Sequence, residues 1–510
     1  MGAFVISNLV SLVRQIVVLN AFGTRADMDA FNAANRVSET LFNLVAGGAL
    51  ASAFIPTFTA LLSQGDRRGA WRLASAIANL ILIVLITASL IAAVSAPWIV
   101  RELLAPGFAS NPQQFQLTVN LLRLMLPSAI IFGLSGLAMG SLNSHRVFFV
   151  PALAPAMYQL GMIFGVLAFS PRWGIYGLGS GVVLGAAFHL CLQIPFLLRQ
   201  GGRYFPTLEL NQPAVREVGR LMLPRLLGVA VVQLNFWVNT WIASHLPEGS
   251  VTGVVVAFTL MLMPQALIAQ SIAIAALPTL SLQFARGRLE EMRTSLSASL
   301  RGVLLLSLPA TLGLILLRKP LIMLLYQRGE FTSHSTELVA WALAWYAAGL
   351  VAHSVVEVMV RAFYAMHDTK TPVLIGTGAM ALNVVLSLSF SSLFGKLSWM
   401  PHGGLALANS LATTLEMIGL IIVMRRRLKG IEGRRILAGA GQALLATLCM
   451  ALALWGWLIL AGEEPVWLVL AGGLSLGLGV YATVVWGLGV GEARQLSTAV
   501  LNRLKQIGGY

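Results

Sequence analysis

A short polar stretch near the start of an apolar chain carries residue types that bind anions. Residues 29–43, DAFNAANRVSETLFN, hold Asp29, Asn32, Arg36, Glu39 and Asn43 at spacings of three or four. On a helix that turns about 100° per residue, these side chains fall within about 80° of one another. Arginine binds phosphate through two parallel hydrogen bonds, so Arg36 is a candidate ligand for an anionic group. Alternatively, Arg36 pairs with Glu39 and the polar face packs two helices together.

Other polar side chains interrupt apolar segments further along the chain. Arg14 lies within the first segment, and Arg225, Asn235 and Asn239 share one face of a segment near residues 218–245. A charge inside a membrane is costly and usually faces a water-filled cavity or pathway. The predicted lining of such a cavity is Arg14, Asp29, Asn32, Arg36, Glu39, Arg225, Asn235 and Asn239. Its arginines favour an anionic substrate, and a large amphiphile could keep its lipid tail in the bilayer while its headgroup enters the cavity.

The elements that position these residues are predicted to be transmembrane helices. The chain of 510 residues is 57% hydrophobic and only 10% charged, and its mean hydropathy is +0.81. Apolar runs of roughly 20 residues recur, which is the length a helix needs to cross a bilayer, and the alternating pattern of a membrane barrel is absent. We expect about fourteen helices, the first of them retained and not a signal peptide. They are placed near residues 3–22, 30–62, 73–96, 114–141, 151–170, 175–198, 218–245, 252–284, 294–317, 335–364, 371–394, 403–424, 437–461 and 467–489.

The basic residues predict the orientation of these helices. With a cytoplasmic N-terminus, 22 of the 34 Lys and Arg residues fall in cytoplasmic connections, 7 in outer ones and 5 in the spans. An excess of basic residues in cytoplasmic loops is the usual asymmetry, so both termini are predicted to be cytoplasmic. The net charge of +15 is then accounted for, and no nucleic-acid role is needed to explain it. Cys191 and Cys449 lie far apart in apolar segments and predict neither a disulfide nor a metal site.

The chain also contains an internal repeat. Pro56 matches Pro278, and Pro151 matches Pro372, at offsets of 222 and 221 residues. Two matches in one order indicate duplication of a six-helix unit. The predicted domains are an N-terminal lobe (1–216), a C-terminal lobe (217–436) and a two-helix appendix (437–510). Because each lobe has an even number of spans, both enter the membrane from the same side, and rocking of the lobes about a cleft is the expected transport motion.

Five motifs, taken in order, resemble the MurJ (MviN) family of lipid II flippases in the multidrug/oligosaccharidyl-lipid/polysaccharide exporter superfamily. They are DAFNAANRVSETLFNLVAGGALASAFIPTF (29–58), LLAPGF (103–108), LNSHRVFFVPALAPA (142–156), YQRGEFT (326–332) and FYAMHDTKTPV (363–373). The resemblance implies an all-α fold of fourteen helices, two six-helix lobes in a V, a cationic central cavity and a lipid groove leading from the last two helices. It further implies alternating access that carries the undecaprenyl-linked peptidoglycan precursor to the outer leaflet of the bacterial cytoplasmic membrane.

Within this resemblance, Arg14 and Asp29 match charged positions that the family uses in its cavity and outer gate. Several other family charges are replaced, since this chain has Asn8, Phe42, Asn43, Gly47 and Thr259 at the corresponding positions. Arg225 occupies a position that is often small and uncharged in the family, and it could restore one positive charge. Another polyprenyl-linked glycan, another large anionic amphiphile, or a non-transporting cell-wall scaffold therefore stays open as an alternative.

The coupling ion is also left open. Some family members bind sodium through acidic groups in the seventh and eleventh helices, where this chain offers Asn383 followed by Ser387. Glu357 and Glu416 are membrane-embedded acids that could respond to protons or cations, or could pair with nearby basic residues. Membrane potential, sodium and protons are thus all candidate driving forces. No cofactor or metal is expected, and the expected partners are the lipid-linked precursor, membrane lipids and cell-wall synthesis proteins around a monomeric chain.

An enzyme is the least favoured function class. The seven histidines are dispersed, His353 and Glu357 form an isolated pair, and HExxH is absent from the sequence. No pair of aspartates occurs in facing predicted spans that could form a catalytic dyad. Small-molecule export, as in the drug exporters of the same superfamily, is disfavoured because fourteen helices are predicted where those exporters have twelve.

Overall fold

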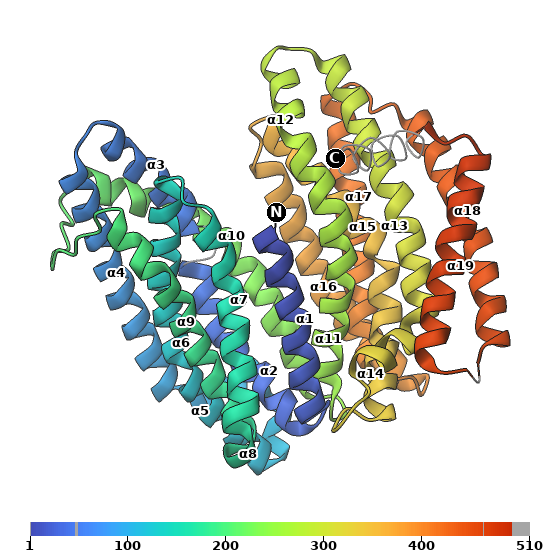
Figure 1. The fold of residues 1–510 in the computed structure, drawn as a ribbon, viewed down its shortest axis with the longest axis horizontal. Helices are drawn as coiled ribbons and strands as arrows, with labels where there is room; N and C mark the ends of the chain where they lie inside the picture. The colour runs from blue at the N-terminus through green and yellow to red at the C-terminus, as the bar shows by residue number, and fades with distance from the viewer. Residues whose placement is uncertain (1, 46–48, 463, 492–510) are drawn as a thin grey trace, which may run out of the picture. The chain divides into compact units, whose positions relative to one another are not determined.

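The computed structural model describes residues 2–45, 49–462 and 464–491, and helices are the regular secondary structure of these residues (Figure 1). The first half contains α1 (Gly2–Phe22), α2 (Ala26–Val45), α3 (Ala49–Ser63), α4 (Arg67–Val94), α5 (Ala96–Trp98), α6 (Pro112–Ser144), α7 (Phe149–Phe164), α8 (Ser170–Trp173), α9 (Ile175–Arg199) and α10 (Pro213–Ser244). Short π or 3-10 turns lie at η1 (Ile99–Leu104), η2 (Pro106–Ser110) and η3 (Gly165–Phe169).

The second half contains α11 (Ser250–Gln265), η4 (Ala266–Gln270), α12 (Ser271–Ala285), α13 (Leu289–Tyr326), α14 (Ser333–Ala348), α15 (Leu350–Ala365), α16 (Lys370–Lys396), α17 (His402–Arg427), α18 (Gly433–Leu460) and α19 (Val466–Gly487). Each of the fourteen predicted spans coincides with one helix or with consecutive helical segments, such as α2 and α3 or α14 and α15. Within the described residues, ten helices are long and apolar enough to cross a bilayer, and two bent pairs bring the number to twelve. The all-α polytopic membrane fold is therefore confirmed.

The chain forms two compact units. Unit 1 comprises Met1–Thr252 with Arg328–Thr332, and unit 2 comprises Gly253–Gln327 with Ser333–Tyr510. The first compact unit thus extends through α10 into the first turn of α11, beyond residue 216. It includes α10 because this helix packs against α2 and α3. The helices α18 and α19 pack against α13 and belong to unit 2 (Figure 1). The predicted lobes that end at residues 216 and 436 were defined by the sequence repeat, which is a different criterion from compactness. Their boundaries therefore stay a prediction.

The core of unit 1 brings α3, α4, α6 and the start of α10 together. Large side chains such as Phe54, Phe58 and Leu73 are fully buried in it. Next to this core, α7 and α9 approach each other through glycines. A Cβ on Gly161 would lie 2.2 Å from the Cα of Gly185, so only hydrogen fits there. Small residues at such contacts allow the backbones of two membrane helices to approach each other closely.

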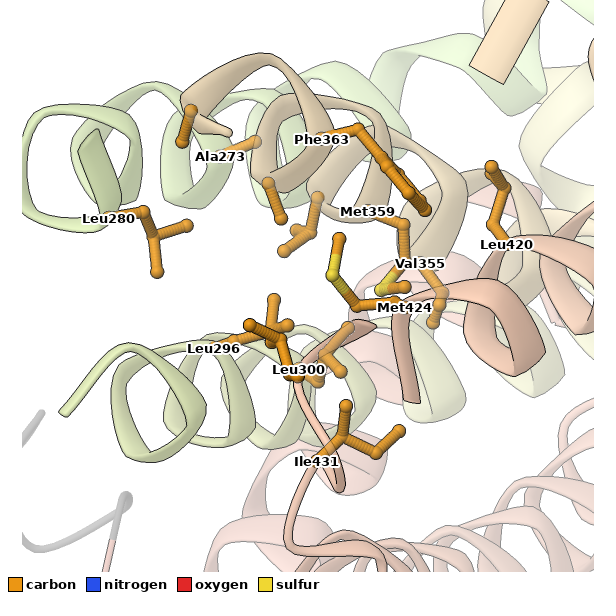
Figure 2. Close-up of a cluster of buried hydrophobic side chains, with 14 of the residues drawn as sticks. Ala273, Leu280, Leu296, Leu300, Val355, Met359, Phe363, Leu420, Met424 and Ile431 are labelled. Carbon is orange, nitrogen blue, oxygen red and sulfur yellow. The ribbon is translucent and has the colours of Figure 1, made fainter. Parts of the chain in front are cut away.

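The core of unit 2 joins α12, α13, α15 and α17. Figure 2 shows side chains of these helices gathered in one cluster, among them Leu280, Leu296, Met359 and Leu420. A second cluster joins α18 and α19 to α13, where the hydroxyl of Tyr481 donates a hydrogen bond to the carbonyl of Leu305. Many large apolar side chains on the outer faces stay exposed, as lipid-facing helices require.

The two halves repeat one another in local backbone geometry. Pro56 and Pro278 are each the eighth residue of a 15-residue helix, and Pro151 and Pro372 are each the third residue of theirs. Left-handed residues recur at the same offsets, with positive φ at the pair Gly65 and Gly287 and at the pair Arg146 and His367. The sequence repeat therefore extends to the shape of the connections.

The glycine contact between α7 and α9 generates a stability prediction. Gly161→Val should lower the free energy of unfolding by about 1–3 kcal/mol or more, because the new side chain collides with backbone that cannot move aside. Thermal unfolding of the detergent-purified protein measures the loss. The matched control is Gly441→Val in α18, where a Cβ meets nothing within 4 Å. Equal melting temperatures for both variants would show that the contact carries no stability.

Candidate functional site

The polar face of α2 begins at Asp29, whose carboxylate is buried and fully engaged. The side chain is 2% exposed. Its Oδ2 accepts a hydrogen bond from the amide of Gly249 at 2.8 Å, and its Oδ1 accepts from the amide of Thr252 at 2.8 Å and from the hydroxyl of Thr252 at 2.6 Å. The first amides of a helix have no partner within the helix and carry partial positive charge. Asp29 therefore caps the start of α11 from another helix.

Asn32, one turn further along α2, joins the same group. Its Nδ2 donates a 3.0 Å hydrogen bond to the hydroxyl oxygen of Thr252. Both polar side chains of the first turn of the face thus bind residues 249–252 of unit 1. The sequence predicted this polar face but not its partner, because Thr252 lies 220 residues away in the sequence. A Gly-Ser-Val-Thr start to an apolar helix was the available signal.

Arg36 and Glu39 form the ion pair that the sequence left as one of two alternatives. The Nη1 of Arg36 lies 3.0 Å from Oε2 of Glu39, and the Nδ2 of Asn35 donates to Oε1 of Glu39 at 2.7 Å. The guanidinium also lies over the ring of Phe236 in α10, 5.1 Å from its centroid. The Arg36 side chain is 16% exposed and that of Glu39 is 43% exposed, so water reaches the acid more than the base.

Further polar contacts join α2 to α10. The indole nitrogen of Trp237 donates to Thr40 at 2.8 Å, and the Thr40 hydroxyl also lies 3.3 Å from Oε1 of Gln233. Along α10, Asn239 donates a 3.3 Å hydrogen bond to Asn235, while its own Oδ1 is buried and has no hydrogen-bond partner in the described structure. The predicted polar residues of α10 therefore lie together. The side chain of Arg225 falls outside the described residues.

Arg14 lies half-buried in α1, which packs against α7. On α7, the hydroxyl of Tyr158 lies within electrostatic range of both Glu39 and Arg14. Arg14, Glu39 and Tyr158 thus belong to one electrostatic neighbourhood of unit 1, and Tyr158 is a member that sequence reasoning missed. A single tyrosine in an apolar helix carries no signal of this kind by itself.

The acids of unit 2 differ in their pairing. Glu357 forms an ion pair with Arg361 one turn later in α15, and both side chains are about one quarter exposed. Asn383 is buried and accepts a 3.1 Å hydrogen bond from Ser387. Glu416 of α17 is half-buried and faces α16, where its Oε1 would lie 3.2 Å from a Cβ on Gly376. No hydrogen bond or ion pair to Glu416 is present in the described part of the chain.

The loop motifs sit at helix ends. Gly107 of LLAPGF lies against the C-terminus of α10, where a Cβ would come within 2.1 Å of the Ser244 carbonyl oxygen. Gly329 of YQRGEFT lies in the same way against the C-terminus of α1, with 2.4 Å between its ideal Cβ and the Asn20 carbonyl oxygen. The amide of Glu330 donates to that carbonyl at 3.0 Å. These motifs therefore close helix ends within unit 1.

A cavity of about 510 Å³ opens beside the first of these loops. Its walls come from the start of α2, the 106–114 segment and the end of α10, and include Asp29, Gln114, Ser244, His245 and Glu248. Glu248 also accepts a 2.8 Å hydrogen bond from the amide of Ala26. Asp29 thus lines the cavity, but both of its carboxylate oxygens are hydrogen-bonded to residues at the start of α11. Its role in binding a substrate stays a prediction.

The motif HDTKTP builds a connection in unit 2. The carboxylate of Asp368 accepts hydrogen bonds from the amides of Lys370 and Thr371, caps α16, and lies 2.6 Å from Nη1 of Arg427. Although partial burial opposes ionisation, these hydrogen bonds and the arginine charge hold the pKa of the Asp368 carboxyl below its usual value. The acidic residue of this motif thus has a structural role as the cap of α16.

Known proteins are similar to this chain over nearly its whole length. The family model for the lipid II flippase MurJ matches residues 18–469. A probable lipid II flippase MurJ from Vibrio cholerae is 31% identical over 506 residues, which cover 95% of this chain and 94% of that protein. The lipid II flippase MurJ from Burkholderia cenocepacia is 31% identical over 434 residues, which cover 84% of this chain and 82% of that protein.

Solved structures show the same fold. A lipid II flippase MurJ in an inward closed conformation superposes with a TM-score of 0.81 at 23% identity, covering 94% of this chain and 96% of that one. An inward-facing multidrug resistance transporter of the MATE family superposes with a TM-score of 0.68 at 16% identity, covering 84% and 96%.

The burial of Asp29 generates a prediction about stability. Asp29→Asn should lower the free energy of unfolding by about 1–3 kcal/mol, because one of its two acceptor oxygens becomes an amide that faces a donor. Differential scanning fluorimetry of the purified protein would detect the loss. Asp27→Asn removes the same charge from an exposed position in the same turn and should leave the melting temperature unchanged. If the two variants melt together, the carboxylate does not stabilise the start of α11.

Proposed function

The chain belongs to the MurJ family of lipid II flippases, and on that premise we propose that it carries lipid II from the inner to the outer leaflet of the bacterial cytoplasmic membrane. The family match over residues 18–469 is the observation that carries this proposal. Alternating access of two helical units is the expected mechanism. The chain is a multi-pass membrane protein, and the excess of basic residues on one side supports cytoplasmic N- and C-termini.

The headgroup site we propose is the polar face of α2 with its neighbours in unit 1. Lipid II presents a pyrophosphate, and Arg36 is the arginine of this face that remains partly exposed. Its Nη1 is held by Glu39, while its Nε is buried without a hydrogen-bond partner in the described structure. A guanidinium has five N–H donors, so Arg36 can bind an oxyanion while it keeps Glu39. Arg14 would add positive charge from α1.

Exposed apolar side chains indicate where the lipid tail could bind. Side chains of α18 and α19 such as Leu452, Trp455, Leu460 and Trp486 are more than half exposed, which suits helices that contact acyl or polyprenyl chains. We propose that this pair docks the polyprenyl tail. Membrane lipids and cell-wall synthesis proteins are the further partners expected of a monomeric chain with this role.

We propose Glu416 as the acid through which protons or cations couple to transport. A carboxylate held inside a membrane without a cationic partner is expensive, and binding a proton or a cation relieves that cost. Glu357 lacks this property because Arg361 neutralises it. Asn383 is already hydrogen-bonded to Ser387 and has no charge to neutralise a sodium ion, so it ranks behind Glu416.

Substitution of Arg36 tests the headgroup site. Arg36→Ala should weaken binding of the pyrophosphate-linked lipid by roughly 10- to 100-fold, because a hydrogen bond to a charged group is typically worth about 1.5–3 kcal/mol. The same polyprenyl chain with a neutral headgroup should bind almost unchanged, as measured by native mass spectrometry. Glu39→Gln is the control that breaks the ion pair and keeps the arginine. Should both variants lose stability equally and neither alter headgroup discrimination, the pair is structural only.

Substitution of the two acids tests the coupling proposal. In proteoliposomes with an imposed proton or sodium gradient, Glu416→Gln should abolish the response of lipid II transport to the gradient and should not lower thermal stability, since it removes an unpaired acid. Glu357→Gln should keep the response but cost stability, because it leaves Arg361 without its counter-ion. A Glu416→Gln protein that still follows the gradient would exclude this residue.

A further inference from the structure

A second cavity in unit 1 has no part in the site described above. It measures about 540 Å³ and lies between the start of α4 and the segment that follows α9. Its lining includes Arg67, Arg68, Trp71, Gln200, Arg203 and Phe205. Three arginines thus surround one hollow, and none of them belongs to the polar face of α2.

The wall of this cavity is held in place by side chains of α4. The Ser75 hydroxyl accepts a 3.0 Å hydrogen bond from the amide of Phe205, and Asn79 donates to the carbonyl of Thr207 at 2.8 Å. The hydroxyl of Tyr204 donates to Oδ1 of Asn79 at 2.8 Å. Residues 203–207, which we call the strap, therefore lie bound along α4. The cavity is a built feature of unit 1 and not a gap under a free loop.

The floor of the cavity is made of packed aromatic rings. Trp71 is 6% exposed and stacks on His145, with 5.7 Å between ring centroids and 17° between planes. Phe58 meets the same indole edge-on at 5.5 Å. The packed rings thus form a well-defined aromatic floor, and a preformed surface favours binding because little order must be imposed on the protein.

The described lining of the cavity contains three arginines and no carboxylate. The guanidiniums of Arg67, Arg68 and Arg203 are exposed, and none forms an ion pair in the described structure. Neither of the two nearby acids lines the cavity: Asp66 caps the start of α4 by accepting from the amide of Gly69, and Glu209 pairs with Arg72. Arginines that converge on one cavity without a carboxylate form a site for an anion, and phosphate is the anion whose geometry they match best.

The residues beside the cavity indicate where that phosphate comes from. Tyr204 in the strap and Leu208 and Leu210 just after it are exposed apolar side chains within a few residues of Arg203. Basic residues next to exposed aromatic and aliphatic side chains are the pattern of protein surfaces that bind anionic lipid headgroups at the membrane interface. We propose that this cavity binds the phosphate of an anionic phospholipid in the leaflet on the predicted cytoplasmic side.

Titration of the full-length protein with phosphatidylglycerol, followed by native mass spectrometry, tests the proposal. Replacement of Arg67, Arg68 or Arg203 by Gln should weaken phosphatidylglycerol binding about fivefold each, and the triple variant on the order of 100-fold. Zwitterionic phosphatidylethanolamine should bind weakly and equally to all variants. A parallel titration with inorganic phosphate separates the two sources of the anion, since a lipid site binds phosphatidylglycerol far more tightly than the free ion.

Two controls keep the result interpretable. Arg220→Gln removes an exposed arginine of α10 that does not line the cavity, and it should leave binding unchanged. The triple Arg→Lys variant keeps the charge but not the guanidinium geometry, so it should lose less affinity than the triple Gln variant, which separates loss of charge from loss of folding. Equal losses in Arg220→Gln and the cavity variants, or a triple Gln variant that binds phosphatidylglycerol like the natural protein, would overturn the proposal. Tight binding of inorganic phosphate with weak binding of phosphatidylglycerol would overturn the assignment to lipid.

Discussion

The three hydrogen bonds that Asp29 accepts from Gly249 and Thr252 organise unit 1. A carboxylate can stay buried when several donors converge on it, and the free amides at the start of α11 supply those donors. Asn32 completes the group, and the Arg36–Glu39 pair follows one turn later. Because α2 is held at this end, its remaining polar side chains meet α10 at Thr40 and Trp237. The polar face is thus part scaffold and part site.

The polar face of α2 and the fourteen helical segments could be predicted because both follow from periodicity and from the length of apolar runs. The period of 3.6 residues places Asp29, Asn32 and Arg36 on one side of a helix whatever lies opposite. The partners could not be predicted in the same way. Thr252 and Phe236 are distant in sequence, and only the packing of α2 with its neighbours brings them to this face.

For the acids of unit 2, too, the sequence pattern could predict some contacts and only packing shows the others. The sequence left Glu357 and Glu416 alike as acids that respond to ions or pair with nearby basic residues, and Glu357 pairs with Arg361. Glu416 has no basic residue three or four positions away on its own helix, but only packing shows that the neighbouring helix α16 places Gly376 beside it. The motifs that made the family recognisable mostly describe local architecture: capping at Asp368 and close backbone contact at Gly107 and Gly329.

The placement of those two glycines joins parts of the chain that are distant in the sequence. Gly107, in the first predicted repeat, closes the end of α10, which begins the second repeat, and Gly329, in the second repeat, closes the end of α1, which begins the first. Each of these loops therefore closes a helix that is distant from it in the sequence. Unit 1 is discontinuous along the chain, because residues 328–332 complete it at the end of α1. During synthesis, the end of α1 consequently stays without this contact until more than 300 further residues have been made.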